Sequence, residues 1–509
     1  MKKIDFDKKL LYVLLLPLFF LLHGINENYG LIPGKTLLKL SLLYIGVTVF
    51  VVVISLLLLR KSSKAVVFSF YFLSVFFLFG AFHDFLKSSL HNSFFVSYSF
   101  LIPLIAITTG VLFISIRKRK NNGSSSMRYF YYLVITFVVL ELATLIYNGV
   151  TNKALDNNIL GSDINLRFKD GVTKTRKPDI YFIVFDGYTS SQCLKEEFNY
   201  DNSEIDSMLI AHNFFLSRSS KSNYNLTAFS LSSTWNLNYL RSGLEQKIVT
   251  SKGLLQAINT FKKNQLVKFL NREGYAFKNY GCLDIENFPT MTTSYFDGLE
   301  YRQIDNQTFS SRIWKDIGWN FTTRNILTGK FRVPKSYTKS KYYHLYRNTF
   351  NLDGLINELN TRSDTPKFIY AHIMLPHEPF YLDSAGNMTS DTAIISQKFS
   401  FKEGYLAQLK YSNTLLKKII PFISKKSNTE KVVIIQGDHG YRDYDESVSK
   451  EKQFMNLNTY YFSDGDYNNL YEGISPVNSF RVILNKYFSQ SFPLLKDSSI
   501  FLVNQKNAL

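Results

Sequence analysis

Two acidic residues and a histidine directly follow runs of apolar residues, an arrangement that suits metal binding. The segment VVIIQGDHGYRDY at 432–444 places Asp438 and His439 after such a run, and DIYFIVFDGY places Asp186 after another. Apolar runs of this length predict buried strands of a parallel sheet, whose carboxyl ends commonly carry the ligand site. Carboxylate oxygens and imidazole nitrogens are ligands for Zn²⁺ or Mn²⁺, whereas sites made only of oxygen favour Mg²⁺ or Ca²⁺. These residues predict a divalent metal site.

A nucleophile for this chemistry is expected in the hydroxyl-rich segment SNYNLTAFSLSSTWNLNYL at 222–240. The segment opens a predicted helix, and a hydroxyl at a helix N-terminus lies among free amide groups that favour an oxyanion or a phosphate. Thr227 stands near this opening, where it can equally be a helix cap. The same alternative applies to its neighbours Ser230, Ser232, Ser233 and Thr234.

Two further histidines belong to a third predicted strand, KFIYAHIMLPHEPFYLD at 367–383. His372 falls inside the strand, where we expect a core or supporting residue. His377 follows the strand, and an imidazole titrates near neutral pH, so it is a candidate for proton transfer to a substrate. Arg442 comes four residues after Asp438. Its guanidinium can grip a phosphate oxygen, or it is simply a solvated loop cation.

Helical patterns separate these strands, for instance at 252–275, where apolar residues recur three and four apart. Strands that alternate with helices predict an α/β domain with a mostly parallel central sheet covered on both faces. We place this domain at 178–509. The preceding residues 151–177 are polar and without a clear period, and we interpret them as a linker or interfacial segment.

The first 150 residues are far more apolar than the rest, and we expect them to form a transmembrane domain, 1–150. A helix needs roughly 20 apolar residues to cross a bilayer. Five stretches are expected to cross the membrane. The first is less continuously apolar than the others, but no small-residue cleavage site of a signal peptide follows it. They lie near 10–33, 36–59, 65–86, 94–116 and 129–149.

Basic residues indicate how these spans are oriented in the membrane. Lys and Arg number four in the tail 1–9, three in 60–64 and five in 117–128, which the positive-inside rule places in the cytoplasm. The domain 178–509 then lies outside the cytoplasm, and it does so even if the first stretch does not span. Glu141 inside the last span is a functional candidate by default, unless it reaches the interface or faces a neighbouring helix.

The formal net charge of +19 is partly explained by this topology, so we infer no nucleic-acid partner from it. Basic residues beyond the last span can rest against lipid headgroups or form a solvated surface. Cys193 and Cys282 lie in the outward domain, where a disulfide is allowed, but the sequence does not say whether they pair. It does not indicate an oligomeric state either.

The ordered set IYFIVFDGY, NYNLTAFS, HIMLPHEP and QGDHGYR resembles the alkaline phosphatase and sulfatase superfamily over about residues 178–485. Within it, the chain is similar to membrane-anchored sulfatase-like transferases such as lipoteichoic acid synthase and the lipid A phosphoethanolamine transferases. The resemblance implies a multi-pass protein of the bacterial cell (inner) membrane with its catalytic domain on the periplasmic or extracellular side. It also implies a membrane lipid and a lipid-linked or glycan substrate as partners.

Residue roles follow from the same resemblance. It implies one divalent metal ion, Zn or Mn, with Asp186, Thr227, Asp438 and His439 as ligands. Thr227 is also the implied nucleophile, giving a phospho-threonine intermediate, and His377 the histidine that faces the substrate. The implied function is that of a metal-dependent phosphotransferase or phosphodiesterase.

The sequence departs from the resemblance at several points. Thr227 is followed by Ala-Phe-Ser, without the proline and arginine of the formylglycine motif C/S-x-P-x-R, which disfavours sulfate ester hydrolysis by that route. No histidine lies four residues after an aspartate, as two-zinc members require, and the first ligand is Asp186 where the transferases commonly have Glu. A sulfatase-like hydrolase of phosphate or sulfate esters and a non-catalytic membrane-anchored binding protein remain alternatives.

Overall fold

In the computed structural model the chain divides into two compact units. The helical unit comprises Met1–Asn157 and Gly298–Arg332, and the sheet unit comprises Asn158–Asp297 and Val333–Leu509. The structure describes residues 12–91, 93–119, 124–151, 159–160, 166–169, 177–240, 248–323, 335–390, 400–425, 429–442 and 448–504. Most of the predicted linker 151–177 therefore lies outside the described residues, and the predicted domain boundaries stay a prediction.

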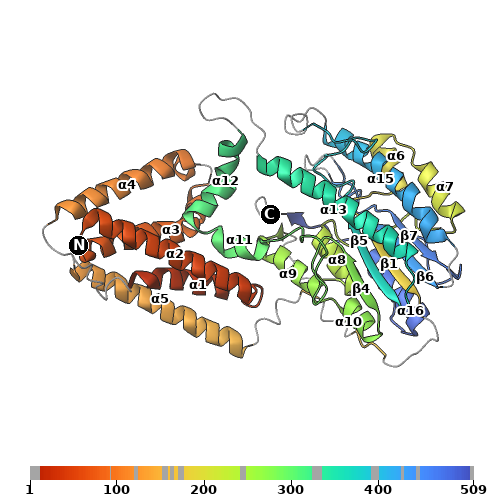
Figure 1. The fold of residues 1–509 in the computed structure, drawn as a ribbon, viewed down its shortest axis with the longest axis horizontal. Helices are drawn as coiled ribbons and strands as arrows, with labels where there is room; N and C mark the ends of the chain where they lie inside the picture. The colour runs from red at the N-terminus through yellow and green to blue at the C-terminus, as the bar shows by residue number, and fades with distance from the viewer. Residues whose placement is uncertain are drawn as a thin grey trace. The chain divides into compact units, whose positions relative to one another are not determined.

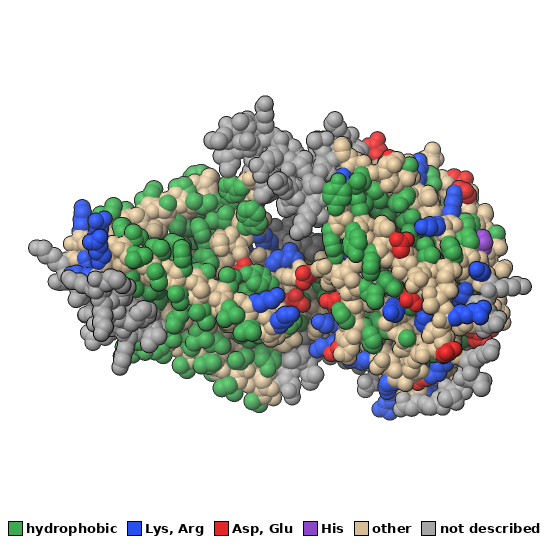
Figure 2. Space-filling model, viewed as in Figure 1, with side chains coloured by type: hydrophobic (Ala, Val, Ile, Leu, Met, Phe, Trp, Pro, Cys, Tyr) green, Lys and Arg blue, Asp and Glu red, His purple; other side chains and the backbone are tan. Residues whose placement is uncertain are grey.

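The helical unit contains the apolar N-terminal helices and two helices from the middle of the sequence (Figure 1). They are α1 (Leu15–Glu27), α2 (Gly34–Leu59), α3 (Ser62–Leu90), the short η2 (Phe94–Val96), α4 (Tyr98–Lys118), α5 (Ser124–Val150), α11 (Leu299–Asp305) and α12 (Phe309–Thr323). Figure 2 shows hydrophobic side chains covering much of the visible surface of this unit, as expected for helices that face lipid.

Four helices of the described chain are long and apolar enough to cross a membrane, namely α2, α3, α4 and residues 129–150 of α5. The prediction of five is wrong for α1, which has 13 residues. At 1.5 Å per residue such a helix rises about 20 Å, less than the roughly 30 Å of a hydrocarbon core. Glu141 of α5 faces α1, where His23 Nδ1 lies 2.8 Å from its Oε1 and Asn26 donates to its Oε2 at 2.6 Å.

The helices α11 and α12 leave the sheet unit and pack against the N-terminal helices, which the sequence analysis did not predict. Ile304 of α11 is buried in one cluster with residues of α1, α2 and α3. The Tyr44 hydroxyl of α2 donates to Asp305 Oδ1 at 3.1 Å, and the Tyr98 hydroxyl of α4 donates to Asp316 Oδ2 at 2.5 Å. Arg312 of α12 forms an ion pair with Asp84 of α3. These contacts hold α11 and α12 within the helical unit.

The sheet unit is built on a six-stranded sheet in the order β2-β7-β6-β1-β5-β4. Its strands are β1 (Asp179–Phe185), β2 (Phe215–Leu216), β4 (Ala276–Tyr280), β5 (Lys367–Ile373), β6 (Lys431–Gly437) and β7 (Asn458–Phe462). The pairs among β4, β5, β1 and β6 are parallel, and only β7 runs antiparallel to its neighbours. The predicted α/β class with a mostly parallel sheet is confirmed. A separate two-stranded sheet pairs β3 (Ile248–Val249) with β8 (Val503–Asn504).

Helices cover both faces of this sheet (Figure 1), because alternate residues of the central strands point to opposite sides. One face packs against α6 (Ser191–Phe198), α7 (Ser203–Ala211), α13 (Lys335–Asn360) and α15 (Phe401–Ser424). The other packs against α8 (Thr227–Trp235), α9 (Ser251–Lys262), α10 (Gln265–Arg272) and α16 (Pro476–Phe488). Each fully buried aliphatic or aromatic side chain stabilises such a core by about 1.5–3 kcal/mol.

The two cysteines are buried on opposite faces of the sheet and remain free thiols. Cys193 lies in the core that includes α6, and Cys282 lies in the core that includes α8. The disulfide that the sequence left open is therefore not formed.

Candidate metal centre

The carboxyl ends of β1 and β6 are level, which brings the predicted acidic ligands together. Phe185 pairs with Gly437 in the parallel register, so Asp186 and Asp438 are the next residues of two adjacent strands. Gly187 has a φ of +69°, a conformation that favours glycine, and its N–H donates to Asp438 Oδ1 at 2.9 Å. Both aspartates are buried, with 1% of each residue exposed.

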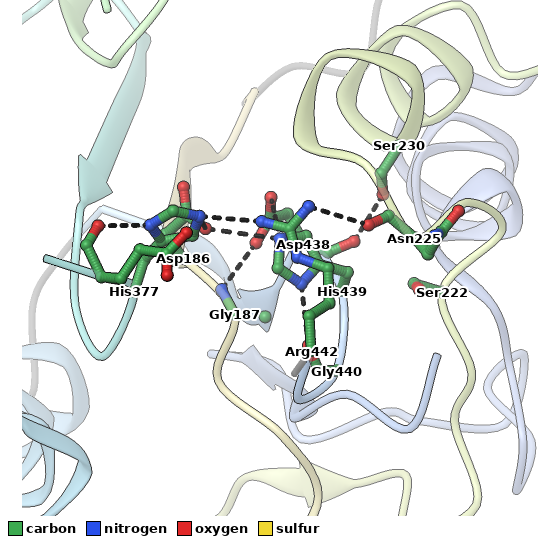
Figure 3. Close-up of polar contacts among 12 residues, drawn as sticks. Asp186, Gly187, Ser222, Asn225, Ser230, His377, Asp438, His439, Gly440 and Arg442 are labelled. Carbon is green, nitrogen blue, oxygen red and sulfur yellow. Dashed lines mark hydrogen bonds and ion pairs between the residues drawn. The ribbon is translucent and has the colours of Figure 1, made fainter. Parts of the chain in front are cut away.

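Asp186 is surrounded by three imidazoles. His439 Nε2 lies 3.5 Å and His377 Nε2 lies 4.0 Å from Asp186 Oδ1, whereas His372 Nε2 lies 3.1 Å from Oδ2. His439 Nε2 is also 3.6 Å from Asp438 Oδ2. Figure 3 shows Asp186, Asp438, His439 and His377 converging on one region at the ends of the strands.

Three buried atoms of this cluster lack hydrogen-bond partners, namely Asp186 Oδ1, Asp438 Oδ2 and His439 Nε2. His439 Nδ1 lies 2.8 Å from the Gly440 carbonyl and donates to it, which leaves Nε2 with a free lone pair. A buried polar atom without a partner costs free energy, and here three such acceptors face one another. A divalent cation bound by these oxygen and nitrogen atoms satisfies all three, so the residues fit the predicted metal.

The pKa of Asp186 reflects this surrounding. Burial raises the pKa of its carboxyl, but the surrounding imidazoles of His377, His372 and His439 lower it more strongly. The net effect holds the pKa of Asp186 well below its usual range. Its carboxylate is therefore ionised at neutral pH, as metal coordination requires.

Thr227 is the first residue of α8, and Leu226 before it is the cap residue. Thr227 is half-buried, and its hydroxyl makes no hydrogen bond with any described residue. The first turn of its helix is held against the aspartate cluster, because Ser230 Oγ donates to the Asp438 carbonyl at 2.6 Å. Thr227 therefore does not act as the helix cap, and its hydroxyl is free for other contacts.

His377 and Arg442 lie next to this cluster and contact each other (Figure 3). Arg442 Nη2 donates to His377 Nε2 at 2.8 Å, and Nη1 donates to the Asn225 carbonyl at 3.2 Å, two residues before Thr227. His377 Nδ1 donates to the Glu378 carbonyl at 2.6 Å. The two side chains line a cleft with about 250 Å³ of empty space, open solvent included, together with Gly187, Glu378, Phe401, Tyr405, His439 and Gly440.

His372 is closer to the cluster than its mid-strand position suggested. It is fully buried in β5, level with Val184 of β1, and contacts Asp186 Oδ2 through Nε2. Its Nδ1 faces the Tyr370 hydroxyl at 2.9 Å and Cys282 Sγ at 3.4 Å. Burial lowers the pKa of His372, but Cys282 and Asp186 outweigh this and raise it to about 10. His372 thus orients the Asp186 carboxylate, and the signal for this was a polar residue inside an otherwise apolar strand.

The comparison with protein families matches the Sulfatase family model to residues 196–480, more than half of the chain. The chain belongs to the Sulfatase family. The matched residues include Thr227, His377, Asp438, His439 and Arg442 and begin after Asp186. This confirms the predicted resemblance to the sulfatase superfamily.

Solved structures of low identity resemble this sulfatase-family chain. The C-terminal periplasmic domain of a phosphoethanolamine transferase from Campylobacter jejuni is 15% identical, with 63% of this chain and 92% of that chain covered and a TM-score of 0.36. The soluble domain of a lipooligosaccharide phosphoethanolamine transferase from Neisseria meningitidis is 13% identical, with 64% of this chain and 89% of that chain covered and a TM-score of 0.36. The C-terminal periplasmic domain of EcEptC from Escherichia coli, in complex with Zn, is 11% identical, with 67% of this chain and 93% of that chain covered and a TM-score of 0.39. No curated protein matches the sequence.

Proposed function

We propose that this chain is a metal-dependent phosphotransferase or phosphodiesterase that acts outside the cytoplasm on lipid-linked or cell-surface glycan substrates. Asp186, Asp438, His439 and Thr227 would hold one divalent ion, Zn or Mn. Thr227 would form a covalent phospho-threonine intermediate, and His377 and Arg442 would contact the phosphoryl group.

One observation carries the proposal: three buried acceptor atoms without partners face one another beside the first turn of α8. A structural cluster would be expected to satisfy these atoms within the protein. Family membership adds to this, because the matched residues include most of the cluster and the whole of α8.

The metal, when bound, would lower the pKa of the Thr227 hydroxyl and neutralise charge on the phosphoryl group. Thr227 Oγ would then attack phosphorus. The Oγ–P bond forms, the bond from phosphorus to the leaving oxygen breaks, and the hydroxyl proton passes to solvent. Free amide groups at the start of α8 would help to bind the phosphoryl oxygens.

His377 and Arg442 would handle the proton and the charge of the leaving group. In the structure His377 Nε2 accepts a hydrogen bond from Arg442 Nη2. Phosphoryl oxygens compete for this guanidinium, since Arg forms strong paired hydrogen bonds with phosphate. Once Arg442 turns to the phosphate, His377 Nε2 is free to take up a proton from solvent and pass it to the leaving oxygen. In the second half-reaction a hydroxyl of the acceptor, or water, attacks phosphorus and frees Thr227.

The apolar helices support a membrane location, and the basic loops at 60–64 and 117–128 support an orientation with the sheet unit outside the cytoplasm. The substrate would then be a membrane lipid or a glycan linked to one. This placement suits transfer of a lipid head group to a surface acceptor.

The test is peptide mass spectrometry of purified full-length protein after exposure to a membrane lipid extract with Mn²⁺ or Zn²⁺. We expect a mass adduct on the peptide that carries Thr227, and its mass would identify the transferred group. Thr227→Ala should carry no adduct, whereas Thr227→Ser keeps a hydroxyl and should retain part of it.

Thr234→Ala is a matched control, because it removes a hydroxyl from the same helix that is already bonded to the Ser230 carbonyl at 2.9 Å. It should leave the adduct in place. Metal binding without any adduct or turnover with every lipid pool would sink the covalent mechanism and favour a binding protein. Release of sulfate from sulfate esters would instead favour the hydrolase alternative.

A further inference from the structure

Arg347 on α13 is a buried cation to which no described residue supplies a counter-charge. Only 1% of the residue is exposed, and it forms no ion pair with a carboxylate of the described chain. Its Nε has no hydrogen-bond partner, and its one hydrogen bond joins Nη2 to His344 Nδ1 at 3.3 Å. Buried charges are normally paired, because desolvation of an unpaired charge is costly.

A second buried arginine of the same unit shows how such a charge is usually satisfied. Arg481 on α16 is also buried, and it donates from Nε and Nη2 to the Leu237 carbonyl at 2.8 and 2.5 Å. Its Nη1 donates to the Pro493 carbonyl at 2.5 Å. Arg481 is thus a structural residue, and the contrast makes the unpaired guanidinium of Arg347 conspicuous.

Two further donors accompany Arg347. Burial first, and then the charge of Arg347, lower the pKa of His344 to about 4, so its imidazole is neutral at neutral pH. Because Nδ1 accepts from Arg347, the proton of His344 is on Nε2 and can be donated. The Tyr295 ring centroid lies 5.4 Å from the Arg347 guanidinium carbon. The Tyr295 hydroxyl is a second neutral donor at this place.

Tyr295 and His344 adjoin the candidate metal centre, and the Arg347 guanidinium lies against both of them. A narrow cleft with about 300 Å³ of empty space, open solvent included, is lined by Tyr295, His344, Asn348, His377, Glu378 and Tyr381 among others. His377 and Glu378 also line the cleft beside His439 and Arg442. The two clefts therefore share a wall formed by these two residues.

We propose that Arg347, His344 and Tyr295 form a second oxyanion subsite that binds a phosphate-type group of the substrate other than the phosphoryl group at the metal centre. This inference rests on the proposed function and names its substrate class, a molecule with two phosphate-type groups. A guanidinium with adjacent neutral donors is well suited to such an anion. Glu378, on the wall shared by the two clefts, bears a carboxylate that disfavours an anion there and keeps the two phosphate groups apart.

Titration of full-length protein with inorganic phosphate, followed by calorimetry with and without Mn²⁺, tests the subsite. Wild type should show one metal-dependent and one metal-independent binding event. Arg347→Gln should weaken the metal-independent event at least about tenfold, in line with loss of a charged hydrogen bond. Arg218→Gln is the matched control, because Arg218 is exposed and lines a different cavity. It should leave both events unchanged.

Metal-independent binding that is equally strong in wild type and Arg347→Gln overturns the proposal, as does its absence in wild type. If Arg347→Gln does not fold, Tyr295→Phe decides, because it removes one hydroxyl from a residue that is 37% exposed and should weaken the same event about threefold. If wild type shows only the metal-independent event, this result would count against the proposed function and leave the subsite standing. Vesicles of phosphatidylglycerol that displace the metal-independent phosphate would identify a lipid phosphate as the natural source, and no displacement would point to a soluble or glycan-borne phosphate.

Discussion

Asp186 is the residue around which the candidate centre is arranged. Its two carboxylate oxygens face three imidazoles, and its backbone N–H is bound to the Ile373 carbonyl of β5 at 2.9 Å. Such fixed orientation is what a metal ligand needs, because hydrogen-bonded supporting residues commonly hold the coordinating atom in place. His372 has this supporting role.

Asp186→Asn should lower metal affinity by at least about 100-fold, because it replaces a charged ligand oxygen with an amide while keeping the shape. Mn²⁺ or Zn²⁺ at about 100 times the dissociation constant should stabilise wild type by about 2.7 kcal/mol, and the variant should gain far less. Thermal unfolding with metal, and again after a chelator, measures both. Asp353→Asn, which alters an exposed carboxylate of α13, should behave as wild type. An equal metal-induced shift in Asp186→Asn would exclude Asp186 as a ligand.

At the residue scale, the sequence allowed the acidic cluster to be predicted, because Asp186 and Asp438 each directly follow an apolar strand. The burial of Arg347 could not be predicted in this way. This residue lies within a helix among polar and aromatic residues, and it contacts Tyr295, a residue distant in sequence. A charge pattern in one helix does not reveal which cations lose their contact with water.

Among the elements, α6 is fastened to the segment before β7 by a compact ion cluster. Lys452 pairs with Glu197 and lies 3.4 Å from Glu196, and Lys402 of α15 lies 3.2 Å from Glu197. The hydrogen bond with Lys452 lowers the pKa of Glu197, and the same bond raises the pKa of Lys452. This cluster holds the C-terminal end of α6 against α15 and the segment before β7.

Lys452→Met should destabilise the protein by about 0.5–1 kcal/mol near neutral pH. The contribution of Glu197 is lost as pH falls through its lowered folded pKa, and that of Lys452 is lost as pH rises through its raised folded pKa. The difference from wild type should therefore be largest between the ordinary pKa values of Glu and Lys, about 4.3 and about 10.4, and should shrink at more acidic and more alkaline pH. Thermal unfolding across this range measures it. Lys221→Met, which breaks the more exposed pair with Glu451, should cost less, and a pH-independent difference would rule out the ion cluster as the cause.

At the element scale, the parallel strands were predictable because strands buried on both sides are continuously apolar. The membrane helices were predictable by length, except for α1. The membership of α11 and α12 in the helical unit was not predictable, since their sequence is no more apolar than that of surface helices in the sheet unit. Their placement depends on pairings such as Tyr44 with Asp305, which are separated by 261 residues.

For the whole molecule, orientation in the membrane is testable by cysteine labelling. Cys193 and Cys282 are buried, with 0% and 1% exposed, so they should react little with a membrane-impermeant maleimide. We expect Ser363→Cys in the sheet unit to be labelled in intact spheroplasts and Ser63→Cys near the basic loop to be labelled only after permeabilisation. The reverse pattern would place the sheet unit in the cytoplasm and contradict the proposed location.

The path of the chain between its two units limits how the protein can be shed from a membrane. The polypeptide passes from one unit to the other near 157, again near 297 and a third time near 332. A protease that cuts only the segment 151–177 leaves the sheet unit anchored through α11 and α12. Cuts at all three passages would divide the sheet unit into two fragments. A fragment that starts after 177 would also carry the buried face of α11, including Ile304, into water, so secretion by a single cleavage is not open to this protein.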